Sequence, residues 1–261
     1  MIKFDPKKEV TQKLKFKPDP KLGNLCLGIL ESVSLEFSET DVTDEKGNPN
    51  KWEFAGMKVP RLIFVFRNIP KTESDPDRFH FYSESVVTQT KNDGSPVSSK
   101  RVESMYGSMF DRLIHIYNAF ENAPNFKPLD VESEIDESAD AETRVKQTTK
   151  LFKDLANCFN KGKDEKTPIY KDGDTYIKIL LKLVADFKTG SRLEIPNFVG
   201  EGFIEMYDPK KSPTIEIKPN ETVELTSKKQ SPSEVAKGGA EDQDKIPDDV
   251  QAMIDKAEGR S

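Results

Sequence analysis

The chain has 261 residues, of which 34% are hydrophobic and 33% are charged, and its formal net charge is −6 at pH 7. This length allows one large or two small domains, and the low apolar content indicates a modest core with a substantial solvated fraction. No apolar run approaches the length of a membrane span and no hydrophobic signal segment is present at the start, so we expect a soluble, cytoplasmic protein without membrane contact.

Charge is distributed unevenly along the chain. Residues 1–21 carry seven Lys against three acids, whereas residues 231–261 carry eight acids against four bases. We therefore expect a basic N-terminal arm over residues 1–22 and a disordered acidic tail over residues 228–261, with helical periodicity at 246–257. The residues between them, 23–227, are expected to form one β-rich domain.

Three strands are predicted in the first part of this domain. Apolar residues alternate from Leu25 to Phe37, and Gly28 within this strand predicts a bend or a bulge. A second strand is predicted from Pro60 to Arg67, and its residues 62–66 are apolar in both phases, which predicts a strand covered on both faces. Residues 78–87 predict the third strand. Four aromatic residues of these strands are expected in the core: Phe64, Phe66, Phe79 and Phe81.

Two helices are predicted in the middle of the chain. Residues 99–120 carry an apolar stripe over several helical turns, and residues 141–160 carry a second one. The segment between them, residues 130–142, contains seven acids and no base, so we expect a solvated connection. Together these elements predict a helical insertion at residues 99–161 between two β-rich halves.

The second β-rich half begins with a predicted hairpin, whose turn is Asp172-Gly173. The next strand alternates, with apolar residues at 177, 179, 181 and 183 on one face and Lys178 and Lys182 on the other. Residues 192–195 are expected to return as a strand, and a Gly-rich loop at 196–203 leads to another one. Short strands are also predicted at 214–218 and 222–226. The fold class is therefore α+β, mainly β, with antiparallel strands.

Chemical signatures of catalysis are absent from the sequence. No Gly-rich phosphate-binding loop, nucleophile elbow or metalloprotease motif occurs. His80 and His115 have no spacing typical of metal ligands, and Cys26 and Cys158 lie far apart, which favours reduced structural thiols. We therefore expect a protein that is not an enzyme and that uses no cofactor or metal.

Aromatic and basic residues are interleaved in the predicted strands. Single-stranded nucleic acid is bound by such surfaces, because flat side chains stack on bases while Lys and Arg contact phosphates. For Trp52, Tyr82, Tyr176 and Phe198 the sequence favours a core position and a surface position about equally. The candidate nucleic-acid-binding residues are Trp52, Phe54, Lys58, Arg61, Arg67, Tyr82, Tyr176, Lys178, Lys182, Arg192 and Phe198.

The segments WEFAG, VPRLIFVF, FDRLIHIYNAF, YIKILLKL and RLEIPNFVGEGFIE together resemble the single-stranded-DNA-binding proteins of tailed bacteriophages. The resemblance covers about residues 25–226. It implies an OB-like antiparallel barrel made from the two β-rich halves, single-stranded DNA as partner, and a location in the host cytoplasm. It also implies an acidic tail that occupies the DNA groove and recruits replication proteins. The basic residues within residues 228–261 depart from that pattern, and a zinc-bearing form of the family is excluded because zinc ligands are lacking.

A second hypothesis is a structural or assembly protein of a virus particle, in which arms, tail and exposed aromatic residues contact neighbouring subunits. Under either hypothesis an oligomer is compatible with the sequence. The two hypotheses predict different positions for the basic side chains. Nucleic-acid binding is favoured if Lys58, Arg61, Lys178, Lys182 and Arg192 converge beside Trp52 and Tyr82, and assembly is favoured if they scatter.

Overall fold

The structure is a computed structural model. It describes residues 1–5, 25–69, 78–91, 93–123, 126, 128–129, 133–159, 171–172, 175–185, 193–195 and 202–215. All of these residues belong to one unit, residues 1–224. The expected tail at 228–261 and most of the expected basic arm lie outside the described residues.

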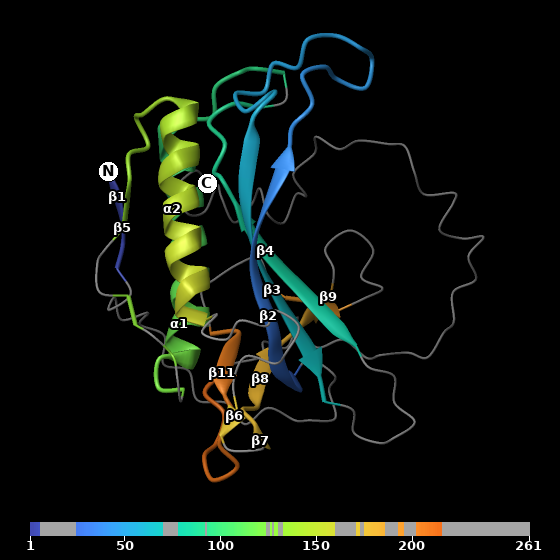
Figure 1. Cartoon of the computed structure of the whole chain (residues 1–261), viewed down its shortest axis with the longest axis vertical. Coiled ribbons are helices and arrows are strands. Elements are labelled where there is room, and N and C mark those ends of the chain that lie inside the picture. Colours follow the sequence, from blue (N-terminus) through green and yellow to red (C-terminus); the bar gives the residue numbers. More distant parts are fainter. Residues whose placement is uncertain are drawn as a thin grey trace, which may run out of the picture. The chain divides into compact units, whose positions relative to one another are not determined.

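Five antiparallel strands form the main sheet, in the order β11-β8-β2-β3-β4 (Figure 1). They are β2 (Leu25–Glu39), β3 (Lys58–Asn68), β4 (Phe79–Ser85), β8 (Ile179–Lys182) and β11 (Ile204–Met206). The start of β2 pairs with β8 and most of its length pairs with β3, so the two β-rich halves join at this strand. Among the described residues β4 and β11 are the sheet's edges, so the sheet is open and the predicted barrel is not closed.

Within the described residues, three further sheets have two strands each. β1 (Ile2–Phe4) pairs with β5 (Ser133–Ile135), β6 (Lys171–Asp172) with β7 (Thr175–Tyr176), and β9 (Val184–Ala185) with β10 (Leu193–Glu194). The predicted hairpin is confirmed as β6–β7, except that Asp172, predicted to lie in the turn, belongs to β6 and pairs with Thr175. The predicted return strand is confirmed as β10.

The pairing of β1 with β5 was not predicted. Phe4 is fully buried, and the ammonium of Lys3 lies 2.9 Å from the carboxylate of Glu134. The first residues of the chain are therefore attached to the fold rather than part of a loose arm. The acid-rich connection between the helices likewise contributes a strand, in which Ser133 and Ile135 are buried on either side of the exposed Glu134.

Both predicted helices are confirmed, as α1 (Ser99–Phe120) and α2 (Ala141–Phe159). α2 begins after Asp140, whose carboxylate accepts a hydrogen bond from the amide of Thr143 at 2.7 Å and so caps the helix. Neither helix in the described part of the chain is long and apolar enough to cross a membrane.

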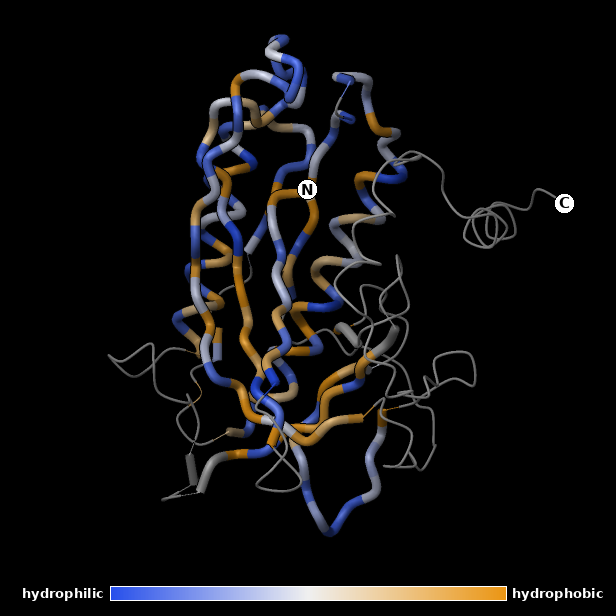
Figure 2. Tube along the Cα trace, turned by 90° about the vertical axis from the view of Figure 1, so that its right-hand side faces the viewer, coloured by the Kyte–Doolittle hydropathy of each residue, from blue (hydrophilic) through white to orange (hydrophobic). Residues whose placement is uncertain are grey.

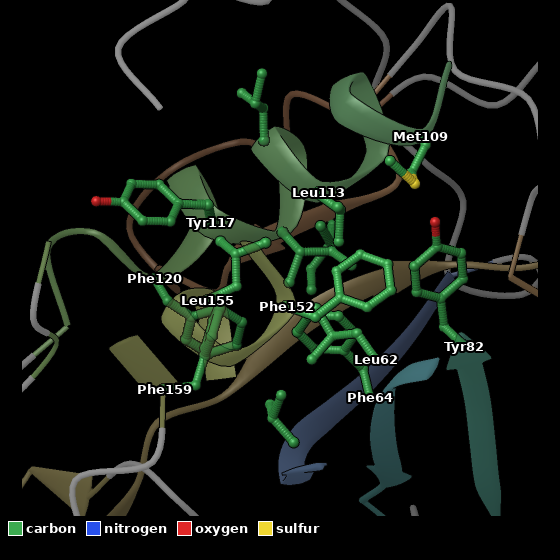
Figure 3. Packing of buried hydrophobic residues seen from close by; sticks show 14 of the residues in the cluster. Leu62, Phe64, Tyr82, Met109, Leu113, Tyr117, Phe120, Phe152, Leu155 and Phe159 are labelled. Atoms are coloured by element: carbon green, nitrogen blue, oxygen red, sulfur yellow. The ribbon is translucent and has the colours of Figure 1, made fainter. Parts of the chain in front are cut away.

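The core lies between these helices and one face of the sheet, here called the inner face (Figure 3). Leu62, Phe64 and Phe66 point from β3 into it, and the ring of Phe159 on α2 meets that of Phe64 edge-on at 5.5 Å. Phe120 on α1 contacts Phe159 in the same geometry at 5.8 Å. Along the strands and helices around this core, hydrophobic residues are interspersed with hydrophilic ones (Figure 2).

The register of β2 against β3 contains a bulge, which lies at Glu31 and not at Gly28. Leu30 pairs with Phe66 and Ser32 with Val65, so Glu31 is the extra residue. Gly28 serves a close approach of backbones instead, because a Cβ atom there would lie 2.8 Å from the carbonyl oxygen of Arg67.

Strand β4 presents the opposite face from the one that its sequence suggested. Tyr82 and Glu84 are buried, whereas Phe79 is 45% and Phe81 is 68% exposed. The physical reason lies on α1, where the guanidinium of Arg112 bonds both the Tyr82 hydroxyl, at 2.7 Å, and the Glu84 carboxylate. An inward charge with a buried partner of opposite sign can occupy a core position.

Candidate nucleic-acid interface

The outer face of the sheet, opposite the helices, carries aromatic and basic side chains in cross-strand rows. Residues directly opposite each other in antiparallel strands project from the same face. Phe81 pairs with Val65, and Phe79 pairs with Arg67. Ser83 pairs with Ile63, and Ser85 with Arg61. The outer face is formed by the two lines of side chains that alternate along β3 and β4: Arg61, Ile63, Val65, Arg67, Phe79, Phe81, Ser83 and Ser85.

Phe79 and Phe81 are two residues apart on one strand, which places them about 6.8 Å apart along it. Both rings are exposed, and they stand beside the half-buried side chains of Ile63 and Val65. The prediction that β3 is covered on both faces is thus wrong, since only its inner face is fully buried. Exposed aromatic rings grouped on an apolar strip indicate a contact surface.

An arginine lies at each end of this strip. Arg61 and Arg67 are six residues apart on β3, a separation of about 20 Å. Arg61 is exposed and its guanidinium donates to the hydroxyl of Ser83 at 3.1 Å. Arg67 is half-buried and its Nε donates to the carboxylate of Glu31 at 3.1 Å. The outer face therefore combines two stacking rings with two cations that can bind phosphate.

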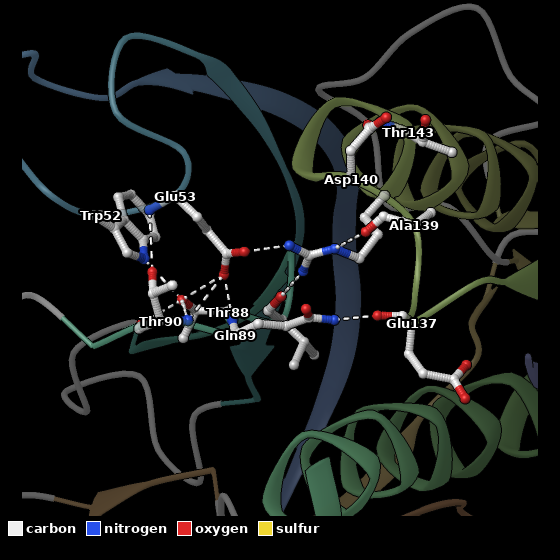
Figure 4. A network of polar contacts seen from close by, with 11 residues as sticks. Trp52, Glu53, Thr88, Gln89, Thr90, Glu137, Ala139, Asp140 and Thr143 are labelled. Atoms are coloured by element: carbon white, nitrogen blue, oxygen red, sulfur yellow. Dashed lines mark hydrogen bonds and ion pairs between the residues drawn. The ribbon is translucent and has the colours of Figure 1, made fainter. Parts of the chain in front are cut away.

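Trp52, which was predicted to bind nucleic acid, is half-buried and belongs to a polar network (Figure 4), and Phe54, predicted to do the same, packs against it. The indole Nε1 of Trp52 donates to the hydroxyl of Thr88 at 2.8 Å, and its ring packs edge-on against that of Phe54 at 5.2 Å. Phe54 is fully buried, and the guanidinium carbon of Arg144 lies 5.3 Å from its ring centroid. Phe54 is therefore not accessible to a base.

The centre of this network is an ion pair between Glu53 and Arg144. Arg144 is 2% exposed. Arg144 also donates to the carbonyl oxygens of Val87, at 3.0 Å, and Ala139, at 3.1 Å. The Glu53 carboxylate accepts from the Thr88 hydroxyl at 2.9 Å. It also accepts from the amides of residues 89 and 90. These bonds fasten the loop before β3 and the segment after β4 to the start of α2.

Tyr82 and Lys182 are buried as well, so neither lies where the predicted interface requires it. Tyr82 is 5% exposed, and burial, followed by the nearby charge of Glu84, raises the pKa of its hydroxyl well above 10. Lys182 is 2% exposed, and its amide donates to the carbonyl of Phe203 at 2.7 Å. Periodicity placed Lys182 outward, but the residue ends β8 beside the buried Leu181 and Leu183.

The other predicted binding residues are dispersed. Lys58 is exposed at the start of β3 and pairs with Glu39 at 3.0 Å. Lys178 is exposed before β8. Tyr176 belongs to β7 through its backbone, while Arg192 and Phe198 lie outside the described residues. Among the predicted residues whose side chains the structure describes, the convergence beside Trp52 and Tyr82 does not occur, and Arg61 and Arg67 are the two that lie on the outer face of β3.

Sequence reasoning missed Phe79 and Phe81 as surface residues. In FHFYSES both phases of the alternation contain an aromatic residue, and the phase with two Phe has the higher hydrophobicity. The signal that decides the phase is the charge of Glu84, whose partner Arg112 belongs to a different element. Arg61 and Arg67 on the neighbouring strand fix the outer face only once the register is known.

A cavity of about 610 Å³ lies elsewhere, between α1, β11 and residues 207–214. His115 and Asn118 of α1 line it, and the His115 Nε2 and Asn118 Oδ1 atoms are buried without a hydrogen-bond partner. Burial lowers the pKa of His115 below 6.5, which favours the neutral imidazole. Among the described residues no group of three or more His, Cys, Asp or Glu is placed to hold a metal ion.

Comparison with known proteins does not assign the chain: no family model, no curated protein and no solved structure matches it.

Proposed function

We propose that this protein binds single-stranded DNA on the outer face of its main sheet. The observation that supports the proposal is the pair of exposed rings on β4 beside the arginines of β3: Phe79 lies opposite Arg67, and Phe81 lies one step nearer to Arg61. Bases stack on the two rings, and phosphates run along β3. The role is that of a replication or recombination accessory, which requires binding and no catalysis.

Geometry supports a short binding track. The two rings are separated by about 6.8 Å, which is twice the rise of about 3.4 Å between stacked bases, so an extended strand can place one base on each ring. The distance of about 20 Å between the two arginines corresponds to about three nucleotides at that spacing. The contact is therefore local, and an overall charge of −6 does not oppose it.

Two finer features belong to the same proposal. An OB-like relationship is supported by the five antiparallel strands. The acidic residues 228–261 are proposed to compete with DNA and to recruit replication proteins, so removing them strengthens DNA binding. Both features are independent of the site itself, which stands on β3 and β4.

The test is fluorescence anisotropy of a labelled oligothymidine at two salt concentrations, with an oligouridine as the RNA arm. Phe81→Ala and Phe79→Ala each remove a stacking ring, which is worth about 1–3 kcal/mol per base, so we expect affinity to fall by about 5- to 150-fold. Arg61→Gln removes one phosphate contact and makes the slope of log K against log salt shallower by about 0.7.

Phe37→Ala provides the matched control. Phe37 is 52% exposed, comparable to Phe79, but it pairs with Pro60, so the alternation along β2 places it on the opposite face from Arg61 and both rings. Its replacement should leave affinity within twofold. Absence of binding at low salt, or equal effects of Phe81→Ala and Phe37→Ala, would overturn the proposal.

A virion assembly role is the second candidate, and two observations favour it. The described Lys and Arg side chains that were predicted to converge are dispersed. Two further apolar side chains are exposed away from the outer face: Phe37 and, at 66%, Val42. Under this hypothesis Phe37→Ala and Val42→Ser reduce self-association, measured by sedimentation velocity, without an effect on DNA. A monomer at all concentrations would exclude self-assembly through this surface.

A further inference from the structure

The bulge in β2 places an acid next to one of the two arginines of the outer face. Glu31 is the residue that the bulge inserts, and bulges commonly redirect a side chain. The Glu31 carboxylate accepts a hydrogen bond from Arg67 Nε at 3.1 Å, and the two side chains are 24% and 28% exposed. Solvent, and therefore a ligand, can reach both members of the pair.

Arg61, at the other end of the strip, has a different partner. Its guanidinium bonds the neutral hydroxyl of Ser83, and Glu36, which pairs with Arg61 across β2 and β3, accepts a hydrogen bond from Ser34 instead. Within the described part of the chain Arg61 makes no ion pair. The outer face thus has one arginine that bonds a hydroxyl and one that bonds a carboxylate.

We propose that Glu31 occupies the position of a DNA phosphate at Arg67 and has to be displaced when DNA binds. The inference rests on the proposed function. A carboxylate and a phosphate accept hydrogen bonds from the same guanidinium donors, so only one of them can hold the Arg67 Nε hydrogen at a time. Glu31 is a positioning residue that weakens binding at one end of the track and leaves Arg61 as the stronger phosphate contact.

This exchange has a signature in the salt dependence. A free arginine that binds a phosphate releases about 0.7 counterion from single-stranded DNA. When Arg67 leaves Glu31, the exposed carboxylate attracts a cation, which cancels part of that release. The slope of log K against log salt is therefore shallower than two free arginines would give, and it becomes steeper by up to about 0.7 when Glu31 is neutral.

The experiment compares Glu31→Gln with Glu39→Gln in the full-length chain, using the labelled oligothymidine. Both changes remove one negative charge from β2, but Glu39 pairs with Lys58 at the exposed end of β3 and not with Arg67. We expect Glu31→Gln to tighten binding by about 3- to 10-fold with a steeper salt slope, and Glu39→Gln to change affinity less than twofold. Glu31→Ser serves as a second variant, and circular dichroism verifies that each variant is folded.

A double-mutant cycle completes the test. Arg67→Gln should weaken binding by less than twofold in the wild type and by about 5-fold or more in the Glu31→Gln background. Equal effects of Glu31→Gln and Glu39→Gln, or weaker binding after Glu31→Gln, would overturn this inference. The proposed function would survive the failure of this inference if the wild type binds and Phe81→Ala weakens binding. If neither the wild type nor Glu31→Gln binds at low salt, both proposals fail.

Discussion

Replacement of Arg144 by methionine tests the physical account of the polar network. Arg144→Met keeps an aliphatic side chain of similar reach but removes the guanidinium, which is 2% exposed. The Val87 and Ala139 carbonyls lose their donor, and the Glu53 carboxylate loses its cation. Removing one member of a buried ion pair costs about 3–5 kcal/mol. Glu53 keeps the donors of residues 88, 89 and 90, so we expect a loss near 3 kcal/mol.

Urea unfolding measures this loss. With a slope of about 2 kcal/mol per M, the midpoint should fall by about 1.5 M. Far-UV circular dichroism reports on the whole fold, and Trp52, the single tryptophan of the chain, reports on the network through its bond to Thr88. If the Trp52 transition precedes the circular dichroism transition, the loop has detached locally before the core unfolds.

The control lies on the same helix. Lys146 pairs with Glu142, and each side chain is 71% exposed. Such surface pairs contribute at most about 1 kcal/mol, and i,i+4 pairs less than that, so Lys146→Met should change the unfolding free energy by less than about 0.5 kcal/mol. The reasoning is refuted if Arg144→Met and Lys146→Met destabilise the protein equally.

Three further results are expected. Burial lowers the pKa of both His80 and His115 below 6.5, so the unfolded state binds more protons below that pH. The free energy of unfolding, measured in urea, should therefore decrease as pH falls from 6.5 towards 5, by at most about 1.4 kcal/mol per pH unit for each histidine; an increase would contradict this. Gly28→Ala should destabilise the protein by about 1–3 kcal/mol in thermal unfolding, because its Cβ would meet the Arg67 carbonyl; an unchanged melting temperature would refute the close approach. Burial raises the pKa of Cys26 to about 12 and Cys158 is buried, so neither thiol should react with a thiol reagent at pH 8 until the chain is unfolded.

The fold was predictable wherever one periodicity was unambiguous. Both helices and the inward residues of β8 follow from apolar patterns that admit a single phase. The pairing of β1 with β5 was not predictable, because three residues carry no usable period and their partner lies far along the chain. The open sheet was also not predictable, since strand order depends on contacts between distant segments. A family resemblance supplied a barrel that the described strands do not close.

The candidate site was harder to predict than the fold. Arg61 and Arg67 were identified because basic residues are interleaved with aromatic ones in the predicted strands. Phe54, Tyr82 and Lys182 were misplaced because residue type alone does not reveal that their side chains are buried. Tyr82 is buried with Arg112, which lies 30 residues away in sequence on another element. Glu31 reaches Arg67 only through a bulge, and a bulge shifts the alternation by one residue at a point that the sequence does not mark.

Substitutions on the two faces of β4 should have separate effects on stability and on DNA binding, because one face packs in the core and the other is exposed. Tyr82 and Glu84 support the core, whereas Phe79 and Phe81 expose much of their surface to water and lose little when they are truncated. We expect the double variant Phe79→Ala/Phe81→Ala to change the unfolding free energy by less than about 1 kcal/mol, as is usual for surface positions. Tyr82→Ala, in contrast, should cost about 3 kcal/mol or more, because it removes a buried ring and a partner of Arg112. Exposed aromatic residues on an edge strand favour aggregation, so their presence without a role in stability favours a ligand that covers them. A large loss of stability in the double variant would assign Phe79 and Phe81 to the fold and remove that argument.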